Sequence, residues 1–330
     1  MRENVLVTGG AGFIGSHTCK LLSKAGYQPV VYDNLSSGSE KCVKWGPLEI
    51  GDILNTEKLR KVMRDCQPQA VIHFAALTSV EESMLKPDLY YKTNVSGTLS
   101  VLEAMVASKV QNIVFSSTAA IFGIPEKIPV LENTMQNPIN PYGRTKMIGE
   151  MLLQDFDDAF GIKFSSLRYF NATGADPDGE IGEMRKIKTH LIPLTLDVAL
   201  NKRECIEIYG SDYDTPDGTG IRDYVHVYDL GIAHILALEK LKKDNISDFY
   251  NLGNGSGHSV KQVLETAKIV SGKEIRFQMA PQRKGDPAKL VADANKAKRE
   301  LGWQPKYSDL KSQIQHAWLW QMYHGNSMSD

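Results

Sequence analysis

Short apolar runs alternate with helix-length amphipathic stretches along the first half of the chain. The runs are NVLVTG, PVVYDN, LEIGDI, AVIHFAA, NIVFSS and KFSSLRYFN. Several, such as VVY and NIVF, are apolar without alternation, which is typical of parallel strands because helices cover both faces of a parallel sheet. The pattern therefore predicts βαβ units that form a doubly wound, parallel Rossmann-type α/β sheet through about residue 172.

The segments after this region predict a second, smaller lobe of mixed α/β structure. ATGADPDGEIGE and GSDYDTPDGTG are rich in Gly, Asp and Pro, and they flank shorter helical patterns such as HLIPLTLDVALNK. The later run DFYNLGNGSG indicates one more strand, so we expect the chain to return to the first sheet. The predicted division is a first domain of residues 1–172, rejoined by about 223–253, and a second lobe of residues 173–222 and 254–330.

Composition limits the classes of partner. Hydrophobic residues make up 42% and the formal net charge is -1, which favours neither disorder nor a broad nucleic-acid-binding face. The four cysteines, Cys19, Cys42, Cys66 and Cys205, form no metal-ligand or disulfide pattern, so we expect no metal and buried free thiols. The start, MRENVLVTGG, enters a strand pattern without a long apolar segment, which predicts a cytoplasmic protein with no membrane span.

The motif TGGAGFIGSH spaces Gly9, Gly12 and Gly15 three apart, between the first predicted strand and the first helix. A helix amino terminus offers unpaired N–H groups, and glycines let a pyrophosphate approach the backbone closely. A glycine-rich turn can also serve only to join a strand to a helix. Its place in the first βα unit favours a dinucleotide site.

Asp33 ends the second predicted strand. A carboxylate there can accept hydrogen bonds from the adenine ribose hydroxyls and would repel a 2′-phosphate, so NAD is favoured over NADP. The Asp-Asn pair before LSSGS also suits a turn, and the two interpretations are compatible.

The stretch INPYGRTK raises the possibility of a catalytic site. If a helix begins near Tyr142, for which Pro141 is suitable, Lys146 lies on the same helical face. A nearby ammonium favours the phenolate of a tyrosine, whose free pKa is about 10, and so favours a general base. Both residues could instead be ordinary surface residues of an amphipathic helix. The strand NIVFSS leads to the hydroxyl of Thr118 at the carboxyl edge of the sheet, where doubly wound folds bind ligands.

Together, TGGAGFIG, SSTAAIFG, YGRTK and RYFNATGA resemble the extended short-chain dehydrogenases/reductases. Within that superfamily, GSDYDTPDGTGIRDYVHVYDL and QRKGDPAKLVAD resemble the UDP-glucose 4-epimerases, also called UDP-galactose 4-epimerases. The resemblance covers nearly the whole chain. It implies reversible NAD-dependent 4-epimerisation of UDP-glucose and UDP-galactose through a transient 4-keto intermediate.

The resemblance also implies roles for individual residues. Tyr142 would be the base, Lys146 would support it and hold the nicotinamide ribose, and Thr118 would hydrogen-bond the sugar O4. The implied NAD-binding residues are Gly9, Gly12, Phe13, Ile14, Gly15, Asp33, Asn34, Asp52, Ile53, Phe74, Ala75, Ala76, Asn94, Tyr142, Lys146 and Tyr169. The implied substrate-binding residues are Thr118, Tyr142, Asn171, His190, Leu191, Tyr209, Arg222, Arg283 and Asp286. Thr78 stands where some members carry a lysine near the cofactor phosphates.

Some of these residues have ordinary structural alternatives. Arg222 and Arg283 suit a diphosphate because guanidinium groups make bidentate, charge-assisted hydrogen bonds, but each could also form a salt bridge. His190 could be a structural histidine. Leu290 aligns where a bulky tyrosine in some members restricts the pocket against N-acetylated sugars. UDP-N-acetylglucosamine is therefore an alternative substrate, unless Leu290 only packs in a strand. UDP-pentoses are a further alternative.

Two other functions compete with epimerisation. Nucleotide-sugar 4,6-dehydratases need an added acid–base pair after the active-site hydroxyl, whereas Ala119, Ala120 and Ile121 follow Thr118 and cannot transfer protons. A non-catalytic NAD-binding regulator is a further alternative, because a fold alone does not establish catalysis. The resemblance finally implies a homodimer, paired through the helical region PDLYYKTNVSGTLSVLEAMVAS and the helix that begins at Tyr142.

Overall fold

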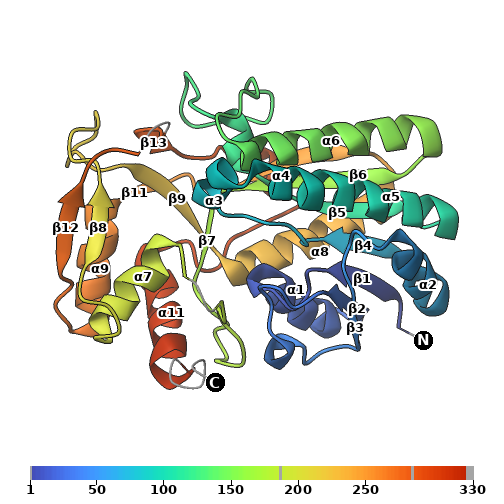
Figure 1. Ribbon diagram of the computed structural model, residues 1–330, viewed down its shortest axis with the longest axis horizontal. Helices are drawn as coiled ribbons and strands as arrows, with labels where there is room; N and C mark the ends of the chain where they lie inside the picture. The colour runs from blue at the N-terminus through green and yellow to red at the C-terminus, as the bar shows by residue number, and fades with distance from the viewer. Residues whose placement is uncertain (1, 186–187, 284–285, 325–330) are drawn as a thin grey trace.

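A seven-stranded sheet, ordered β10-β6-β5-β4-β1-β2-β3, forms the centre of the computed structural model, which describes residues 2–185, 188–283 and 286–324 (Figure 1). Every neighbouring pair of strands in it is parallel. The strands are β1 (Asn4–Thr8), β2 (Gln28–Asp33), β3 (Leu48–Ile50), β4 (Ala70–His73), β5 (Asn112–Thr118), β6 (Lys163–Tyr169) and β10 (Asp248–Leu252). The predicted doubly wound parallel sheet is therefore confirmed, and all seven predicted runs are strands in it.

Helices cover both faces of this sheet. On one face, α1 (Phe13–Lys24) and α8 (Val227–Asp244) share a core with Val5 and Val7 of β1. On the other, α2 (Thr56–Cys66), α5 (Gly97–Ser108) and α6 (Pro141–Phe160) share a core with Leu6. Successive side chains of a strand point to opposite faces, so the three successive residues at the centre of β1, Val5, Leu6 and Val7, are all apolar.

The second part of the structure is built around β9 (Ile221–His226). This strand pairs antiparallel with β11 (Gly257–Ser259) and parallel with β7 (Asn171–Thr173) and β13 (Lys289–Leu290). A separate parallel pair consists of β8 (Ile206–Tyr209) and β12 (Phe277–Ala280). The helices α7 (Leu191–Ala199), α9 (Val260–Ser271) and α11 (Leu310–His324) share one core in this part. This agrees with the predicted smaller lobe of mixed α/β structure.

The chain crosses between the two parts more than once. After β9, α8 and β10 return to the large sheet. After β13, α10 (Asn295–Glu300) and the residues that follow pack there too, with Ala297 and Trp303 buried in the core that contains Leu230. The Trp303 Nε1 donates to the Asp229 backbone oxygen at 2.9 Å. The predicted division assigned this late segment to the second lobe, because its short charged helix carries no local sign of the core it joins.

The remaining short elements connect the larger ones. They are η1 (Glu40–Cys42), α3 (Val80–Leu85), α4 (Pro87–Tyr90), the π-helical η2 (Tyr91–Ser96) and η3 (Ala119–Phe122). All four cysteines are free thiols; Cys19 and Cys42 are buried as expected, whereas Cys66 and Cys205 are partly exposed. Within the described part of the chain, the helices are too short or too polar to traverse a lipid bilayer.

Candidate active site

The glycine-rich turn between β1 and α1 is built for close backbone approach. Gly9 has a φ of +73°, and a Cβ on it would lie 2.6 Å from the Ala75 backbone nitrogen. A Cβ on Gly15 would lie 2.3 Å from the Gly9 oxygen. Gly12 is the N-cap of α1 and supplies no side-chain acceptor. The first-turn amides of α1 are thus available to an anionic group, as the motif predicts.

Asp33 joins the end of β2 to this turn. Its Oδ2 accepts a hydrogen bond from the Ala11 N–H at 3.0 Å, and its Oδ1 accepts one from the Leu35 N–H at 2.8 Å. Burial raises the pKa of Asp33, while these two hydrogen bonds lower it. A carboxylate oxygen can accept a second hydrogen bond, so Asp33 can hold the turn and still receive ribose hydroxyls.

Asn94, in η2, ties the segment after β4 to α6. Its Oδ1 accepts from the Leu77 N–H at 2.8 Å, and its Nδ2 donates to the Leu77 oxygen and to Thr145 Oγ1, each at 3.0 Å. π-Helical turns often occur at functional sites, and this one directs Asn94 inward. Thr145 was not predicted from the sequence.

The other predicted cofactor residues along this edge are Phe74, Ala75 and Ala76 after β4, and Asn34, Asp52 and Ile53 near β2 and β3. Asn34 and Asp52 are hydrogen-bonded to each other.

Tyr142 is the second residue of α6. The Asn140 side chain caps this helix by accepting from the Gly143 N–H at 2.8 Å, and Pro141 occupies the first helical position. Tyr142 hydrogen-bonds with Thr118, the last residue of β5. Burial raises the pKa of Tyr142, while the hydrogen bond with Thr118 and the positive charge of Arg185 lower it. The structure therefore brings together the predicted phenol and hydroxyl.

Lys146 lies one helical turn further along α6 and is 3% exposed. Its Nζ donates to the backbone oxygen of Ser116 at 2.7 Å and lies 4.8 Å from the centroid of the Phe115 ring. Burial lowers the pKa of Lys146 to about 7, although the charge of Glu150 raises it. The ammonium is thus held by β5, and at neutral pH it can lose its proton. Ser116 also uses its hydroxyl to hydrogen-bond with Tyr169, another predicted cofactor residue.

A buried ion pair supports this part of the site. Glu150, one turn beyond Lys146 on α6, accepts hydrogen bonds from Arg168 Nε and Nη2 at 2.9 and 2.7 Å. It also accepts from Ser117 Oγ at 2.6 Å and from Ser166 Oγ at 2.9 Å. The sequence prediction did not include this network. Its only local sign is a charged residue, Arg168, beside the apolar Leu167 in β6.

Arg185 is a further residue that the sequence prediction did not include. It lies in the connection between β7 and α7, and its Nη2 donates to Thr78 Oγ1 at 3.2 Å. Thr78 belongs to the segment between β4 and α3. The second part of the structure therefore places a cation against the ligand-binding edge of the sheet.

The predicted substrate residues lie in or beside the second part, and four of them contact one another in pairs. Arg222 of β9 donates from Nη2 to Asp286 Oδ1 at 2.7 Å. The Arg283 guanidinium lies 3.8 Å from the centroid of the Tyr209 ring. Three further predicted residues are Asn171 at the start of β7, His190 at the N-cap of α7 and Leu191 at its first position.

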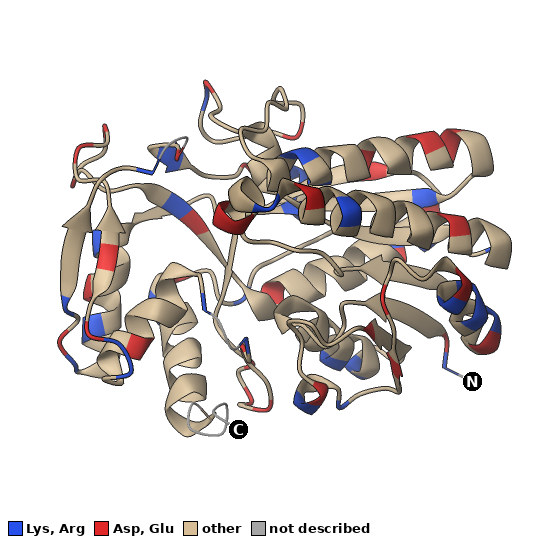
Figure 2. Cartoon of the chain, viewed as in Figure 1, with Lys and Arg blue, Asp and Glu red and all other residues tan. Residues whose placement is uncertain are grey.

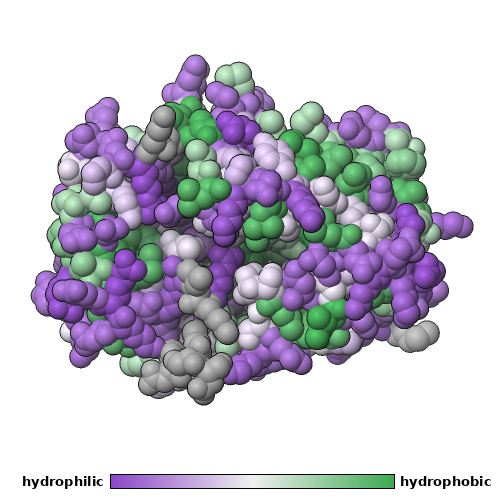
Figure 3. Space-filling model, viewed as in Figure 1, coloured by the Kyte–Doolittle hydropathy of each residue, from purple (hydrophilic) through white to green (hydrophobic). Residues whose placement is uncertain are grey.

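The surface between the two parts is hollowed and largely hydrophilic in the view of Figure 3. Charges of both signs are interspersed over the molecule in the same view (Figure 2), in keeping with its net charge of -1. A polar hollow with arginines nearby suits a charged small molecule better than a nucleic acid.

A glycine-rich turn on a doubly wound parallel sheet, with threonine, tyrosine and lysine at the carboxyl edge, defines the class of extended short-chain dehydrogenases/reductases. A family model described as GDP-mannose 4,6 dehydratase matches residues 6–314. A UDP-glucose 4-epimerase of Rhizobium meliloti is 48% identical over 318 residues, which are 96% of this chain and 97% of that protein. The chain belongs to the UDP-glucose 4-epimerase family.

Solved structures of this family superpose closely on the chain. A UDP-glucose 4-epimerase from Brucella ovis in complex with NAD has a TM-score of 0.94 and 48% identity, and the match covers 96% of this chain and 98% of that one. A UDP-glucose-4-epimerase from Stenotrophomonas maltophila with bound NAD and formylated UDP-arabinopyranose has a TM-score of 0.95 and 38% identity. Its match covers 99% of this chain and 100% of that one.

Proposed function

We propose that this chain catalyses the reversible NAD-dependent 4-epimerisation of UDP-glucose and UDP-galactose, with Tyr142 as the base. The observation that carries the proposal is the hydrogen bond between Tyr142 and Thr118 at the carboxyl edge of the sheet, with Lys146 one turn away. A base must lie within hydrogen-bond reach of the proton that it removes. Thr118 and Tyr142 together can bind one sugar hydroxyl between them.

In the proposed reaction, Tyr142 accepts the proton of the sugar 4-hydroxyl while Thr118 hydrogen-bonds O4. NAD would supply the hydride acceptor and then the hydride donor at the sugar C4. Tyr142 returns the proton to O4 when the 4-keto intermediate is reduced on its opposite face. Lys146 would hold the nicotinamide ribose, because its buried ammonium faces the end of β5 beside Tyr142.

The residues at the glycine-rich turn fit NAD. Gly9 permits close packing against Ala75, the amides of α1 have no side-chain cap, and Asp33 retains acceptor capacity at the end of β2.

We propose that residues 1–172 and about 223–253 bind NAD and that residues 173–222 and 254–330 hold the UDP group. Arg222 and Arg283 are the candidates for the diphosphate, since a ligand anion can replace or add to their present partners, Asp286 and Tyr209.

Dehydration competes with this proposal because the matched family model bears a dehydratase description. The residues after Thr118 form η3, whose members Ala119, Ala120 and Ile121 carry no acid or base. Elimination of water across C5 and C6 needs such a pair in addition to the oxidising set. The proposal therefore predicts a product with the mass of the substrate, whereas dehydration would lower the mass by one water.

A second candidate activity is 4-epimerisation of UDP-N-acetylglucosamine or a UDP-pentose. Leu290 of β13 packs against the cluster of Ile121, Phe122 and Val130. Two members of this cluster closely follow Thr118, so the size of the side chain at position 290 matters near the proposed sugar site. A leucine leaves more room than a tyrosine. Turnover of UDP-N-acetylglucosamine that is lost in Leu290→Tyr, with UDP-galactose turnover retained, would support this second activity.

We also propose a homodimer formed through α4, η2, α5 and α6. Large apolar side chains are exposed there, including Leu89 at 38%, Tyr91 at 37% and Met151 at 53%. Apolar patches gather over this region in Figure 3. Exposed apolar clusters favour association. Light scattering should give twice the chain mass, and Met151→Glu should reduce it. A monomeric unaltered protein would exclude the dimer.

The experiment for the principal proposal is to incubate the purified protein with UDP-galactose, without added NAD, and to follow UDP-glucose by NMR. Conversion is expected, with Tyr142→Phe at least about a hundredfold slower because general acid–base catalysis typically contributes that much. Retained binding of UDP by Tyr142→Phe separates a catalytic defect from misfolding. Absence of conversion by the unaltered protein, even with NAD added, would reject this substrate pair and would favour the alternative sugars or a non-catalytic regulator.

A further inference from the structure

A buried series of hydrogen bonds begins at Thr8, the last residue of β1. The Thr8 backbone oxygen accepts the N–H groups of Phe74 and Ala75 at 2.9 and 3.1 Å. Gly9, the next residue, has no room for a Cβ, because the Ala75 backbone nitrogen would lie 2.6 Å from it. Thr8 therefore lies where the glycine-rich turn meets the end of β4, and its hydroxyl is hydrogen-bonded to His73 Nδ1 at 2.6 Å.

His73, the last residue of β4, connects Thr8 to α5. Its Nε2 is hydrogen-bonded to Thr98 Oγ1 at 3.1 Å, and the Thr98 hydroxyl donates to the Asn94 backbone oxygen at 2.6 Å. Burial and then the charge of Lys146 lower the pKa of His73 to about 3, so the ring is neutral at neutral pH. A hydroxyl has one proton, so Thr98 can only accept from His73. The ring therefore carries its proton on Nε2, and its Nδ1 accepts the Thr8 hydroxyl proton.

Asn94 continues the series from η2 to α6. Its Nδ2 donates to Thr145 Oγ1 at 3.0 Å, and the Thr145 hydroxyl donates to the backbone oxygen of Tyr142 at 2.8 Å. Every donor between Thr8 and Tyr142 is thus oriented in the same direction, toward α6. The side chains of the series, from Thr8 to Thr145, are all buried. Buried hydrogen bonds in such a series polarise one another, so each bond strengthens the next.

His73 also lies beside the second functional residue of α6. Its ring stacks on Phe115 of β5, with ring centroids 5.7 Å apart and an interplanar angle of 30°. The Lys146 Nζ lies 4.8 Å from the centroid of the same Phe115 ring. His73 is therefore joined to Tyr142 through hydrogen bonds and to Lys146 through one aromatic ring.

We propose that His73 is a positioning residue that fixes the helix of Tyr142 and Lys146 relative to the glycine-rich turn. The inference rests on the proposed roles of Tyr142 as base and of the turn as the NAD site. A cofactor held at the turn and a phenol held on α6 then keep one fixed separation. Proton and hydride transfer depend on this separation, since a displacement of about 1 Å can lower a rate by about a hundredfold.

The first test compares His73→Leu with His73→Gln. Leucine can make neither hydrogen bond, whereas glutamine offers one donor and one acceptor. In UDP-galactose conversion, His73→Leu should lower kcat at least about tenfold and leave KM within about twofold, because misplaced reacting groups slow the reaction while the second part still holds the UDP group. His73→Gln should restore most of kcat. Equal kcat in the two variants would overturn the proposed role.

Thr98 and Thr195 form a matched pair that separates positioning from a general loss of stability. Both are buried, and each hydroxyl donates to the backbone oxygen four residues earlier, at 2.6 Å for Thr98 and 2.9 Å for Thr195. Thr98 also accepts from His73. Thr98→Val and Thr195→Val should lower the melting temperature to similar extents, but only Thr98→Val should lower kcat. If kcat falls equally in both, the inference fails, and this comparison holds even if His73→Leu does not fold.

Two measurements do not depend on turnover. 15N NMR of the imidazole, with the His73 signal assigned from His73→Gln, should show a neutral ring with its proton on Nε2 and no titration between about pH 5 and 8. The NAD bound per chain after gel filtration should be lower in His73→Leu than in His73→Gln. A proton on Nδ1, or equal NAD in the two variants, would overturn the inference.

These measurements also separate the two proposals. If the unaltered protein converts UDP-galactose but the His73 ring carries its proton on Nδ1, the inference fails and the epimerase proposal stands. If conversion is absent, but the proton is on Nε2 and His73→Leu retains less NAD, the epimerase proposal fails and the link between His73 and the turn stands.

Discussion

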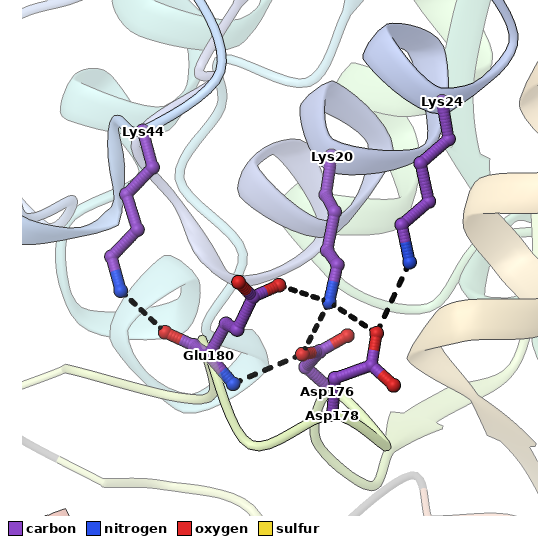
Figure 4. Close-up of polar contacts among 6 residues, drawn as sticks. All are labelled: Lys20, Lys24, Lys44, Asp176, Asp178 and Glu180. Atoms are coloured by element: carbon purple, nitrogen blue, oxygen red, sulfur yellow. Dashed lines mark hydrogen bonds and ion pairs between the residues drawn. The ribbon is translucent and has the colours of Figure 1, made fainter.

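The ammonium nitrogen of Lys20 lies 2.6 Å from Oδ2 of Asp176, and both side chains are only 2% exposed. Lys20 belongs to α1, the helix after the glycine-rich turn, and Asp176 belongs to the loop after β7. The same ammonium contacts Asp178 and Glu180 at 2.8 and 2.5 Å (Figure 4). One buried cation thus joins the proposed cofactor helix to the loop that enters the second part, and it occupies the centre of an acidic cluster that could otherwise attract a metal ion.

Removal of the Lys20 ammonium should lower the free energy of unfolding. Lys20→Met leaves Asp176 buried without its charge partner, and loss of one member of a buried pair typically costs about 3–5 kcal/mol of unfolding free energy. The matched control is Lys24→Met, because Lys24 contacts the same Asp178 but is 57% exposed. An exposed pair contributes roughly 0–1 kcal/mol. Equal denaturation midpoints in urea for the two variants would contradict the structural role of Lys20.

Two glycines with the same backbone angle allow a test of close packing in the glycine-rich turn. Gly9 and Gly179 both have a φ of +73°, but a Cβ on Gly9 would meet the Ala75 backbone at 2.6 Å, whereas one on Gly179 would meet nothing within 4 Å. Gly179→Ala should therefore show only the left-handed backbone penalty of about 1–2 kcal/mol. Gly9→Ala should lose more stability and should retain less NAD on purification. Similar losses in both variants would show that the backbone angle alone, and not the contact with Ala75, constrains Gly9.

The buried pair of Glu150 and Arg168 should matter for both folding and activity. Glu150→Gln keeps the shape of the side chain but removes the charge that balances Arg168 and Lys146, so we expect a loss of about 3 kcal/mol or more in unfolding free energy. The pKa of Lys146, which Glu150 raises, should fall further, and the site should lose positive charge near pH 7. Glu103→Gln, on the exposed side of α5, is the control. Unchanged thermal stability of Glu150→Gln would count against this role.

Stability should fall on mild acidification. Burial lowers the pKa of seven histidines, among them His73 to about 3, His17 and His234 to about 4, and His226 to about 2. Their unfolded pKa is about 6.5, so between pH 6.5 and 4 the unfolded chain binds more protons than the folded one, and stability decreases as pH falls. Three buried carboxyl groups act in the opposite direction, because burial raises the pKa of Asp223 to about 6 and also raises those of Asp33 and Asp229, but the histidines are more numerous.

Thermal unfolding at pH 7.0, 6.0 and 5.0 measures this dependence. Each neutral buried histidine contributes a slope of up to about 1.4 kcal/mol per pH unit in this window. His73→Gln should reduce the slope, because glutamine can hydrogen-bond with Thr8 and Thr98 without titrating. A melting temperature that is constant from pH 7.0 to 5.0 would rule out the expected dependence.

Much of the large sheet could be predicted from local sequence. Each of the seven strands carries its own apolar run, and the glycine-rich turn carries its own spacing, because a parallel strand between two helical layers must be apolar on both faces. The first turns of α6 could be predicted for a similar reason: Asn140 and Pro141 are local start signals, and the four-residue spacing of Tyr142 and Lys146 is a property of any helix.

Other features could not be predicted because they depend on residues far apart in the chain. The apposition of Arg185 and Thr78 spans 107 positions, and that of Lys20 and Asp176 spans 156. Neither leaves a periodic or local sign. The crossing of α10 back to the first core has the same cause: Trp303 is a lone aromatic in a polar segment, and only the folded chain shows that it packs beside Leu230.

The sequence by itself determined the fold class, the turn that suits a dinucleotide, and the helix that carries Tyr142 and Lys146. Each of these depends on interactions within a few residues or on the repeated alternation of strand and helix. Only the tertiary structure decided which charges act on Tyr142, that the Lys146 ammonium is held by the Ser116 oxygen, and which buried cations join the two parts. Electrostatic interactions act through space and grow with burial, and neither distance nor burial is set until the whole chain has folded.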